Sequence, residues 1–214
     1  MALHLNVDLS APADPPLLLA AEVIQAGGII VYPTDTIYGI GASAWNPDAV
    51  ARVQEIKKRT EAKPILVLVE SIDAAYGVAE EVNGTARQLM ERFWPGPLTL
   101  VLKSSVHLPA ALTLGKGTIG VRVPASAACL RLLALCGGPL TSTSANLSGE
   151  GTPGTAAAIE RALGPGIDLF LEGGVLPPSP PSTVLDVTGP RPHLIREGAI
   201  SLAQLTSVTA SIDR

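Results

Sequence analysis

The sequence has few aromatic residues and few cysteines. Its 214 residues include only 2 Trp, 3 Tyr and 2 Phe, although 47% of them are hydrophobic. The core must therefore be built from Val, Ile, Leu and Ala, which is typical of buried strands covered by helices. The length fits one domain, and we expect a single domain over residues 1–214 with its core at about 15–200.

Clusters of metal-binding residues are also missing. Cys129 and Cys136 lie seven positions apart in an apolar stretch, and we interpret them as buried free thiols. They and the 3 scattered histidines lack metal-ligand spacing, so we predict no metal site built from side chains. No apolar run has membrane-spanning length, and the N-terminus lacks the basic segment of a signal peptide, so we expect a cytoplasmic protein.

Positive charge is scarce but concentrated. The formal net charge is −4, which argues against indiscriminate nucleic-acid binding over the whole surface. Five of the 15 basic residues nevertheless fall within twelve positions, at Arg52, Lys57, Lys58, Arg59 and Lys63. Such a run is usually a solvated helix end, where cations complement the helix dipole. Because a strand is predicted directly after this run, a phosphate-binding site at the mouth of that strand is the competing interpretation.

Apolar segments with helical and with strand-like patterns alternate along the chain. Helices are predicted at residues 17–26, from 46 onward to the basic run, and at 85–93, 125–135 and 155–163. Strands are predicted at 29–32, 64–69, 98–102, 118–123, 140–143, 168–171, 183–187 and 193–196, followed by a polar tail. Residues 33–41 hold two glycines and several hydroxyls and cannot be regular throughout. The alternation predicts an α/β sheet protein.

Two standard nucleotide-binding motifs can be excluded. Residues 115–120 match G-x-G-x-x-G, but a β-branched strand follows them, whereas the dinucleotide fingerprint needs a helix at that place. Lys116 is followed by Gly117, so the P-loop pattern G-x-x-x-x-G-K-[ST] is absent as well. If the protein binds ATP, it does so without either motif.

Hydroxyl-rich segments follow two predicted strands. The first contains Thr34, Asp35, Thr36 and Tyr38, and the second, 141–149, has six hydroxyl or amide side chains within eight residues. Ligands of α/β proteins commonly bind outside the carboxyl ends of strands, so both segments are candidate binding loops. The alternative for each is local, a hydrogen-bonded turn for the first and a cap of the following helix for the second.

Arg122 stands alone in an otherwise apolar predicted strand. An arginine in such a place more often pairs with a structural carboxylate, but it is also a good bidentate clamp for the carboxylate of a substrate. Ser182, which follows the proline-rich segment 177–181, and Arg196 are weak signals by themselves.

Several motifs occur in a fixed order along the chain. They are residues 32–41, the run 57–59, Lys63-Pro64, the segments 94–99, 121–124 and 144–149, Ser182-Thr183, and residues 194–200. Together they closely resemble the YrdC/TsaC family of L-threonylcarbamoyladenylate synthases, in its short single-domain form, over roughly residues 15–200.

The resemblance implies a fold and a reaction. The fold is a twisted, mostly parallel mixed α/β sheet with flanking helices around a large basic cavity. The reaction forms threonylcarbamoyl-AMP and pyrophosphate from L-threonine, bicarbonate and ATP, for the N6-threonylcarbamoyladenosine modification of tRNA. Mg²⁺ is expected with the ATP, and the product would pass to the complex that transfers the group to tRNA.

The resemblance also assigns residues to roles. ATP contacts fall on Arg59, Lys63, Thr118, Ser144, Thr152 and Arg196. The threonine pocket falls on Thr34, Thr36, Tyr38, Leu68, Arg122, Ser142 and Ser182. Lys57 and Asn146 complete the K-x-R and S-x-N pairs of the family, so the implied catalytic set is Lys57, Arg59, Lys63, Ser144 and Asn146. Many relatives have His where Leu68 stands and Gly near Ser179, so this chain departs from the family pattern at both places.

Two other functions stay open at this point. A non-catalytic module could use a basic concavity to bind double-stranded RNA or tRNA directly, although the acidic net charge and the hydroxyl-rich loops favour a small-molecule site. Carbamoyl-handling proteins of hydrogenase maturation contain similar modules, but within much longer chains that carry zinc-finger cysteines, and this sequence has neither feature.

Overall fold

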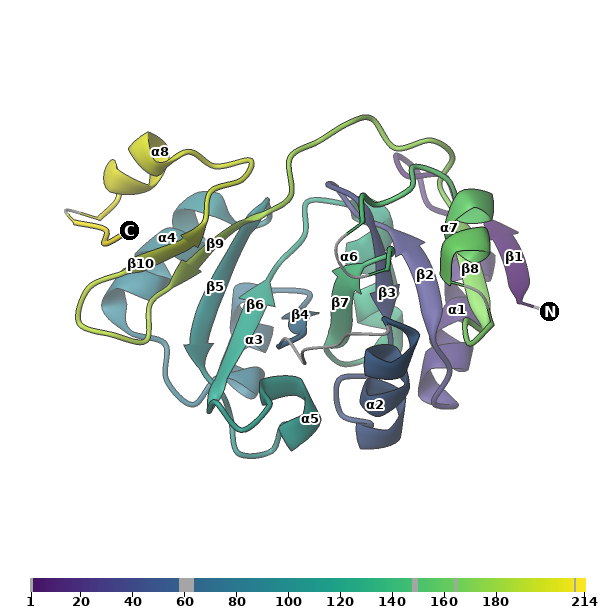
Figure 1. Ribbon diagram of the computed structural model, residues 1–214, viewed down its shortest axis with the longest axis horizontal. Helices are drawn as coiled ribbons and strands as arrows, with labels where there is room; N and C mark the ends of the chain where they lie inside the picture. The colour runs from purple at the N-terminus through teal and green to yellow at the C-terminus, as the bar shows by residue number, and fades with distance from the viewer. Residues whose placement is uncertain (1, 58–63, 148–149, 164, 210) are drawn as a thin grey trace.

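A computed structural model describes residues 2–57, 64–147, 150–163, 165–209 and 211–214. Ten strands form one sheet that runs across the whole molecule (Figure 1). In spatial order they are β1 (Leu3–Asn6), β8 (Leu169–Glu172), β2 (Ile30–Pro33), β3 (Tyr38–Gly41), β7 (Leu140–Ser144), β4 (Leu66–Leu68), β6 (Thr118–Arg122), β5 (Leu98–Lys103), β9 (Thr183–Asp186) and β10 (His193–Arg196).

Helices flank this sheet. They are α1 (Asp14–Gln25), α2 (Pro47–Ile56), α3 (Ile72–Val78), α4 (Gly84–Phe93), α5 (Ala110–Thr113), α6 (Ala127–Cys136), α7 (Ala156–Leu163) and α8 (Leu202–Thr206). In Figure 1, α3 and α4 lie with the half of the sheet that contains β5 and β6, whereas α1, α2, α6 and α7 lie with the half that contains β2 and β3. No helix within the described residues is long and apolar enough to cross a membrane.

The α/β fold with a mixed sheet and flanking helices is confirmed, and among the described residues the strand pairs are divided almost evenly between parallel and antiparallel. Four of the neighbouring pairs are parallel, namely β1–β8, β2–β8, β4–β6 and β5–β9. The other five are antiparallel, namely β2–β3, β3–β7, β4–β7, β5–β6 and β9–β10. The central strand β7 is antiparallel to both of its neighbours, so its carboxyl end lies beside the amino ends of β3 and β4.

The helix termini follow from local sequence. Asn46 caps α2 by accepting hydrogen bonds from the backbone N–H groups of Asp48 and Ala49, and Pro47 occupies the first turn, where no N–H is needed. Val50 and Val53 then recur on the buried face of this helix. Lys57 follows the last helical residue directly, so α2 delivers the start of the basic run to the centre of the molecule.

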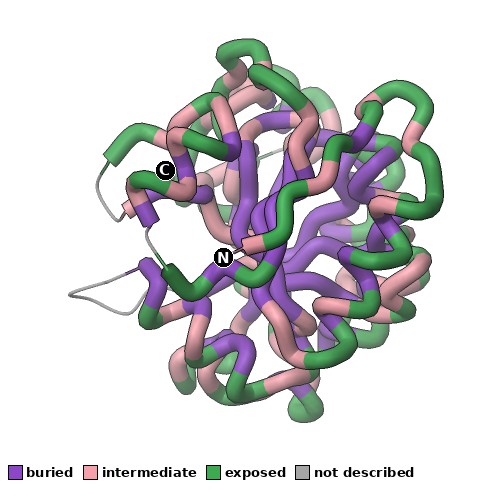
Figure 2. Tube along the Cα trace, turned by 90° about the vertical axis from the view of Figure 1, so that its right-hand side faces the viewer, coloured by how far each residue is buried: buried purple, intermediate pink, exposed green. Residues whose placement is uncertain are grey.

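Burial is deepest along the strands, and exposure is concentrated in the loops and near the termini (Figure 2). One apolar cluster packs α1 and α6 against β2 and β8, and it includes Leu68 and Cys129. A larger cluster, built mainly from Val, Ile, Leu and Ala, packs most of the other strands and helices together and also includes Val31 of β2 and Phe170 of β8. Both cysteines are free; Cys129 is buried and Cys136 is half-buried. The aliphatic core and the two free thiols are therefore confirmed, whereas the predicted burial is confirmed for Cys129 alone.

The segment 33–41 is more regular than its glycines suggest. It folds back as a hairpin in which β3 pairs antiparallel with β2. The glycines are needed for close packing, because a Cβ atom at Gly41 would come within 2.4 Å of Cε1 of Tyr32. Four further elements also escaped the sequence pattern: the edge strand β1, the short helices α3 and α5, and α8 in the tail that was expected to be merely polar.

Candidate functional site

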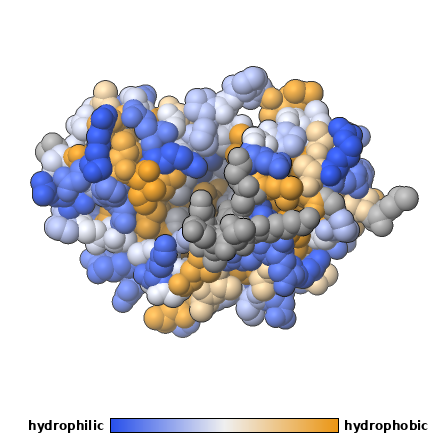
Figure 3. All heavy atoms as spheres, viewed as in Figure 1, coloured by the Kyte–Doolittle hydropathy of each residue, from blue (hydrophilic) through white to orange (hydrophobic). Residues whose placement is uncertain are grey.

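A cavity of about 550 Å³ opens on the middle of the sheet. Its walls come from β3, β4, β5, β6, β7, β9 and β10 and from loops beside them. In Figure 3, hydrophilic residues cover most of the coloured part of this face, and hydrophobic groups lie on both sides of its centre.

Nine of the residues predicted for the site line this cavity together. They are Thr34, Thr36, Tyr38, Thr118, Arg122, Ser142, Ser144, Ser182 and Arg196. They come from segments that lie far apart in the sequence, and the sheet brings them to one place. Arg59 and Lys63, which were also predicted, lie outside the described residues.

Two glycines provide space in the floor of the cavity. Gly39 on β3 lies opposite Ser144 of β7, and an added Cβ atom there would come within 3.1 Å of Oγ of Ser142. Gly120 on β6 lies beside β4, and its Cβ atom would come within 3.1 Å of Cβ of Leu66. Side chains at these positions would push into neighbours that themselves line the cavity.

Arg122 ends β6 and is buried, with 4% of its surface exposed. Its Nε donates to the carbonyl oxygen of Gly96 at 2.9 Å, Nη1 to Oγ1 of Thr36 at 3.2 Å, and Nη2 to Oδ2 of Asp35 at 2.6 Å. A guanidinium has five N–H groups, so these bonds fix its plane and leave two donors for a ligand in the cavity. Arg122 thus makes the structural ion pair and also lines the cavity, so the two interpretations of the sequence are compatible.

The stiff segment 94–97 supplies one of these anchors. The Trp94–Pro95 peptide bond is cis, and Nε1 of Trp94 donates to the carbonyl oxygen of Leu98 at 2.7 Å. The N–H of Gly96 donates to the carbonyl oxygen of Val123, which leaves the carbonyl of Gly96 to accept from Arg122. The turn of residues 94–97 therefore anchors the side chain of Arg122 through the carbonyl oxygen of Gly96.

Asp35 is the site residue whose role the sequence did not identify. Its side chain is 15% exposed, and its Oδ2 pairs with Arg122. Its other oxygen, Oδ1, is buried and has no hydrogen-bond partner among the described residues. The only signal in the sequence was its place between Thr34 and Thr36, which also suits an ordinary turn.

The loop before β3 serves both as a turn and as part of the site. Oγ1 of Thr34 accepts hydrogen bonds from the backbone N–H groups of Thr36 and Ile37, each at 3.1 Å, and donates to the carbonyl oxygen of Ile37 at 2.6 Å. Thr34 thereby shapes the turn. Thr36, held by that turn, presents its hydroxyl to Arg122.

Lys57 is one of the most buried side chains in the molecule, with 1% of its surface exposed. Its ammonium donates to the carbonyl oxygens of Ser144 and Asn146 and, at 2.7 Å, to Oδ1 of Asn146. It does not line the cavity. Within the described residues, Lys57 therefore fixes the loop that leaves β7, and Ser144 on that strand does line the cavity.

A second polar group closes the opposite wall. Oγ of Ser182 lies 2.9 Å from Oγ1 of Thr99, and Arg196 donates to the carbonyl oxygen of Ser182 from both Nε and Nη2, at 3.2 and 2.7 Å. Partial burial, and to a lesser extent the nearby charge of Arg122, lower the pKa of the Arg196 guanidinium from its ordinary value. A second cation close to Arg122 favours anionic ligands.

Four predicted residues lie outside the lining of the cavity: Lys57, Leu68, Asn146 and Thr152. Lys57 and Asn146 bond to each other behind it. Leu68 was expected to line the threonine pocket, but it packs into the apolar cluster with α1 and α6 and is 1% exposed. Tyr38 lines the cavity, yet its hydroxyl is used by the backbone, donating to Gly174 and accepting from Gly173.

The described lining carries more positive than negative charge. Its cations are Lys116, Arg122 and Arg196, and its one carboxylate is Asp186. Oδ1 of Asp186 accepts from the N–H and the hydroxyl of Thr188. No group of three or more His, Cys, Asp or Glu side chains suited to a metal ion occurs within the described ranges.

The fold and the site together define an α/β protein with a cavity on a mixed sheet, and the charged residues in its described lining are three cations and one carboxylate. A family model described as Sua5, YciO and YrdC, telomere recombination, matches residues 22–198. This protein therefore belongs to the Sua5/YciO/YrdC family, which confirms the resemblance seen in the sequence.

Individual relatives agree with this assignment. A threonylcarbamoyl-AMP synthase of Pyrococcus abyssi is 36% identical over 91% of this chain and 57% of its own length. The crystal structure of P. abyssi Sua5 complexed with L-threonine superposes with a TM-score of 0.94 at 34% identity, over 99% of this chain and 62% of that one. The crystal structure of Escherichia coli YciO superposes with a TM-score of 0.88 at 29% identity, over 96% of this chain and 100% of that one. The chain thus spans about three fifths of the length of the P. abyssi proteins.

Proposed function

We propose that this protein is an L-threonylcarbamoyladenylate synthase, which forms threonylcarbamoyl-AMP and pyrophosphate from L-threonine, bicarbonate and ATP. The observation that carries the proposal is the single cavity that gathers nine of the residues expected to bind threonine or ATP. The name of the P. abyssi synthase and the threonine bound in P. abyssi Sua5 support it.

The end of the cavity at Arg122 is suited to the amino acid. Arg122 would bind the threonine carboxylate with the two N–H groups that its protein partners leave free. The hydroxyls of Thr36, Ser142 and Ser182 would contact the rest of threonine, including its side-chain hydroxyl. A pocket that pairs that hydroxyl discriminates against analogues without it, because its own polar groups would stay unpaired.

The remaining assignments concern ATP. Thr118, Ser144 and Arg196 line the cavity and would contact the nucleotide, together with Arg59, Lys63 and Thr152 as the family resemblance implies. Lys57 and Asn146 would act by holding the loop after β7 in place, since neither lines the cavity. Leu68 has no direct contact in this scheme.

The reaction then needs mainly positioning and charge stabilisation. The neutral amine of threonine attacks the carbon of CO₂, which bicarbonate releases with loss of hydroxide, and the amine loses a proton, giving a carbamate. A carbamate oxygen attacks the α-phosphorus of ATP, the bond between that phosphorus and the bridging oxygen breaks, and pyrophosphate leaves with the electron pair. Cations at the phosphates stabilise the charge that develops on the leaving group.

Mg²⁺ fits this site as a companion of ATP rather than as a resident ion. Asp186 is the one carboxylate in the described lining, and Mg²⁺ in nucleotide sites is commonly held by one or two carboxylates and by the phosphates. When bound, the ion would neutralise phosphate charge.

The product would feed the N6-threonylcarbamoyladenosine modification of tRNA, and we propose a cytoplasmic location and handover to the complex that transfers the group. Direct RNA binding is the alternative from a different class. It predicts an RNA affinity that falls steeply with salt, without any turnover of ATP.

The test supplies purified protein with ATP, Mg²⁺, bicarbonate and L-threonine and measures pyrophosphate release, with mass spectrometry of the adenylate. We expect release to depend on threonine and to fall at least tenfold with L-2-aminobutyrate, which lacks the hydroxyl but keeps the carboxylate and the amine. Pyrophosphate release that does not depend on threonine, or no release at all, would refute the proposed synthase activity.

A further inference from the structure

Lys116 is a cation of the cavity wall that none of these assignments uses. It lies in the turn between α5 and β6, where Leu114, Gly115 and Gly117 have positive φ angles of 53°, 72° and 66°. The N–H of Lys116 donates to the carbonyl oxygen of Thr113 at 3.0 Å, and the carbonyl oxygen of Gly117 accepts from Ser104 at 3.0 Å. The turn is thus tied on one side to α5 and on the other to the residue that follows β5.

Lys116 lies just before β6, and Arg122 is the last residue of that strand. β6 begins at Thr118, two residues after Lys116, and ends at Arg122. With a rise of about 3.3 Å per residue, the Cα atoms of Thr118 and Arg122 are roughly 13 Å apart, and Lys116 lies farther along. Because both cations line the same cavity, a ligand that reaches from one to the other must be elongated.

The two ends differ in how their cations are compensated. Arg122 has a carboxylate partner, Asp35, and Arg196 is held by the carbonyl oxygen of Ser182. The ammonium of Lys116 has no hydrogen bond or ion pair within the described part of the chain, and Asp186, the carboxylate of the lining, does not pair with it. Among the described residues, Lys116 therefore has no charged partner at its end of the cavity.

We propose that Lys116 binds the β- and γ-phosphates of ATP and then the pyrophosphate that leaves. The proposal rests on the proposed function, which places an amino acid at the Arg122 end and a nucleotide in the remaining space. Of the groups in such a ligand, the polyphosphate carries the most negative charge, and an ammonium on a flexible stem binds it as a point charge. Thr118, between the two cations, is already assigned to the nucleotide by the family resemblance.

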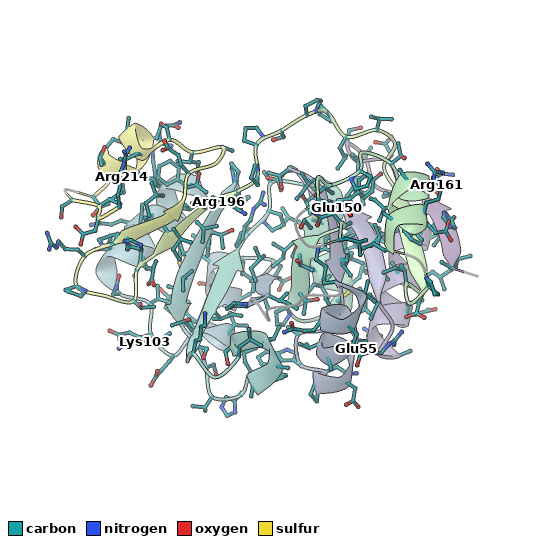
Figure 4. The ribbon with its side chains drawn as sticks, in the orientation of Figure 1. Glu55, Lys103, Glu150, Arg161, Arg196 and Arg214 are labelled. Atoms are coloured by element: carbon teal, nitrogen blue, oxygen red, sulfur yellow. The ribbon has the colours of Figure 1, made fainter. Side chains whose placement is uncertain are left out.

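The experiment measures binding without turnover. Calorimetry in the absence of threonine and bicarbonate gives the dissociation constants of Mg·ATP, AMP and inorganic pyrophosphate for the wild type, Lys116→Ala and Lys116→Arg. The matched control is Lys103→Ala, which removes the same charge from β5 opposite Thr118, outside the cavity lining. Lys103 is the last residue of β5 (Figure 4), and its Nζ is 3.4 Å from Oε2 of Glu81.

Lys116→Ala should raise the dissociation constants of ATP and pyrophosphate about tenfold and leave that of AMP nearly unchanged, because only the outer phosphates lose a charged partner. Lys116→Arg should restore most of the affinity, and Lys103→Ala should bind within about twofold of wild type. Equal ATP affinity in Lys116→Ala and Lys103→Ala, or an equal loss of AMP and ATP, would overturn the role of Lys116. Failure of the proposed synthase function would be distinguishable, because the wild-type protein would then bind ATP but show no threonine-dependent pyrophosphate release.

Discussion

Two buried cations of the predicted site, Lys57 and Arg122, are held in different ways. Lys57 is 1% exposed and donates to carbonyl and amide oxygens of the loop after β7. Arg122 is 4% exposed and forms an ion pair with Asp35, and its guanidinium has further N–H groups that can donate to a ligand in the cavity. Lys57 does not line the cavity, and Arg122 does.

This difference indicates two roles: Lys57 shapes the site by holding a loop, and Arg122 is placed to bind a ligand. The compact ammonium of Lys57 donates to several oxygens of one loop and so holds that loop in place. A guanidinium has a planar fork, so it can be anchored on some edges and still offer others. We therefore expect substitutions of Lys57 to act first on the loop and on stability, and substitutions of Arg122 to act first on threonine.

The largest effect is expected for Lys57→Met, which keeps the length of the side chain but removes its donors. The carbonyl oxygens of Ser144 and Asn146 and Oδ1 of Asn146 would lose a charged donor, and a hydrogen bond to a charged group contributes about 1.5–3 kcal/mol. We expect the free energy of unfolding, measured by urea denaturation, to fall by about 4 kcal/mol, with loss of pyrophosphate release.

The control is Lys103→Met on the surface, which should change stability by less than about 0.5 kcal/mol. A Lys57→Met protein of wild-type stability with only a raised KM for ATP would contradict the structural role of Lys57 and favour direct contact with phosphate.

The next effect concerns the pair of Arg122 and Asp35. Arg122→Gln removes one partner of a buried ion pair, which typically costs about 3–5 kcal/mol when the other charge is left uncompensated. Asp35 is partly accessible, so we expect the lower end of that range for stability. The KM for threonine should rise by about 100-fold or more, with a much smaller change for ATP.

The double variant Asp35→Asn/Arg122→Gln tests the coupling. Removing both charges should destabilise the protein less than the sum of the two single changes, because no unpaired charge remains. Threonine binding should stay lost, since the clamp is absent. Strict additivity of the unfolding free energies would mean that the contact between Oδ2 and Nη2 carries no interaction energy.

The smallest effect is expected for a cation at the surface. His4 on β1 is held by Glu172 and Glu160, and the hydrogen bond to Glu172 is the main reason that its pKa is raised above 6.5. Because the folded state binds the proton more tightly, this contribution is fully present below the unfolded pKa and is lost as the pH rises through the folded pKa.

His4→Gln should therefore lower the unfolding free energy at pH 6 by about 0.5 kcal/mol and leave it unchanged at pH 9. Urea midpoints at the two pH values give the comparison. If His4→Gln lowered the unfolding free energy as much as Lys57→Met does, the burial of a cation would not determine how much it contributes to stability.

Much of this architecture could be predicted from local patterns. The helix of Pro47–Ile56 follows from its asparagine cap and its apolar spacing, and β6 follows from its β-branched residues. The residues of the cavity could be named from the order of motifs, and nine of them do line it.

The partners of these residues could not be predicted, because they depend on which strands become neighbours. Nothing near Asp35 in the sequence indicates that it meets Arg122, 87 positions away. Leu68 also shows this limit, since its contact with the cluster of α1 and α6 arises from the placement of β4 in the sheet. The hairpin of β2 and β3 was obscured because glycine suggests irregular backbone, whereas Gly41 here permits contact with Tyr32.

The glycines in the floor of the cavity, Gly39 and Gly120, make the cavity easier to narrow than to widen by substitution. A methyl group at either position would come within 3.1 Å of a neighbouring atom in the cavity wall. A single substitution at Gly39 or Gly120 can therefore narrow the cavity but cannot widen it, because glycine has no side chain to shorten. We expect variants selected for larger amino acids to change the loops around the opening and to keep both glycines.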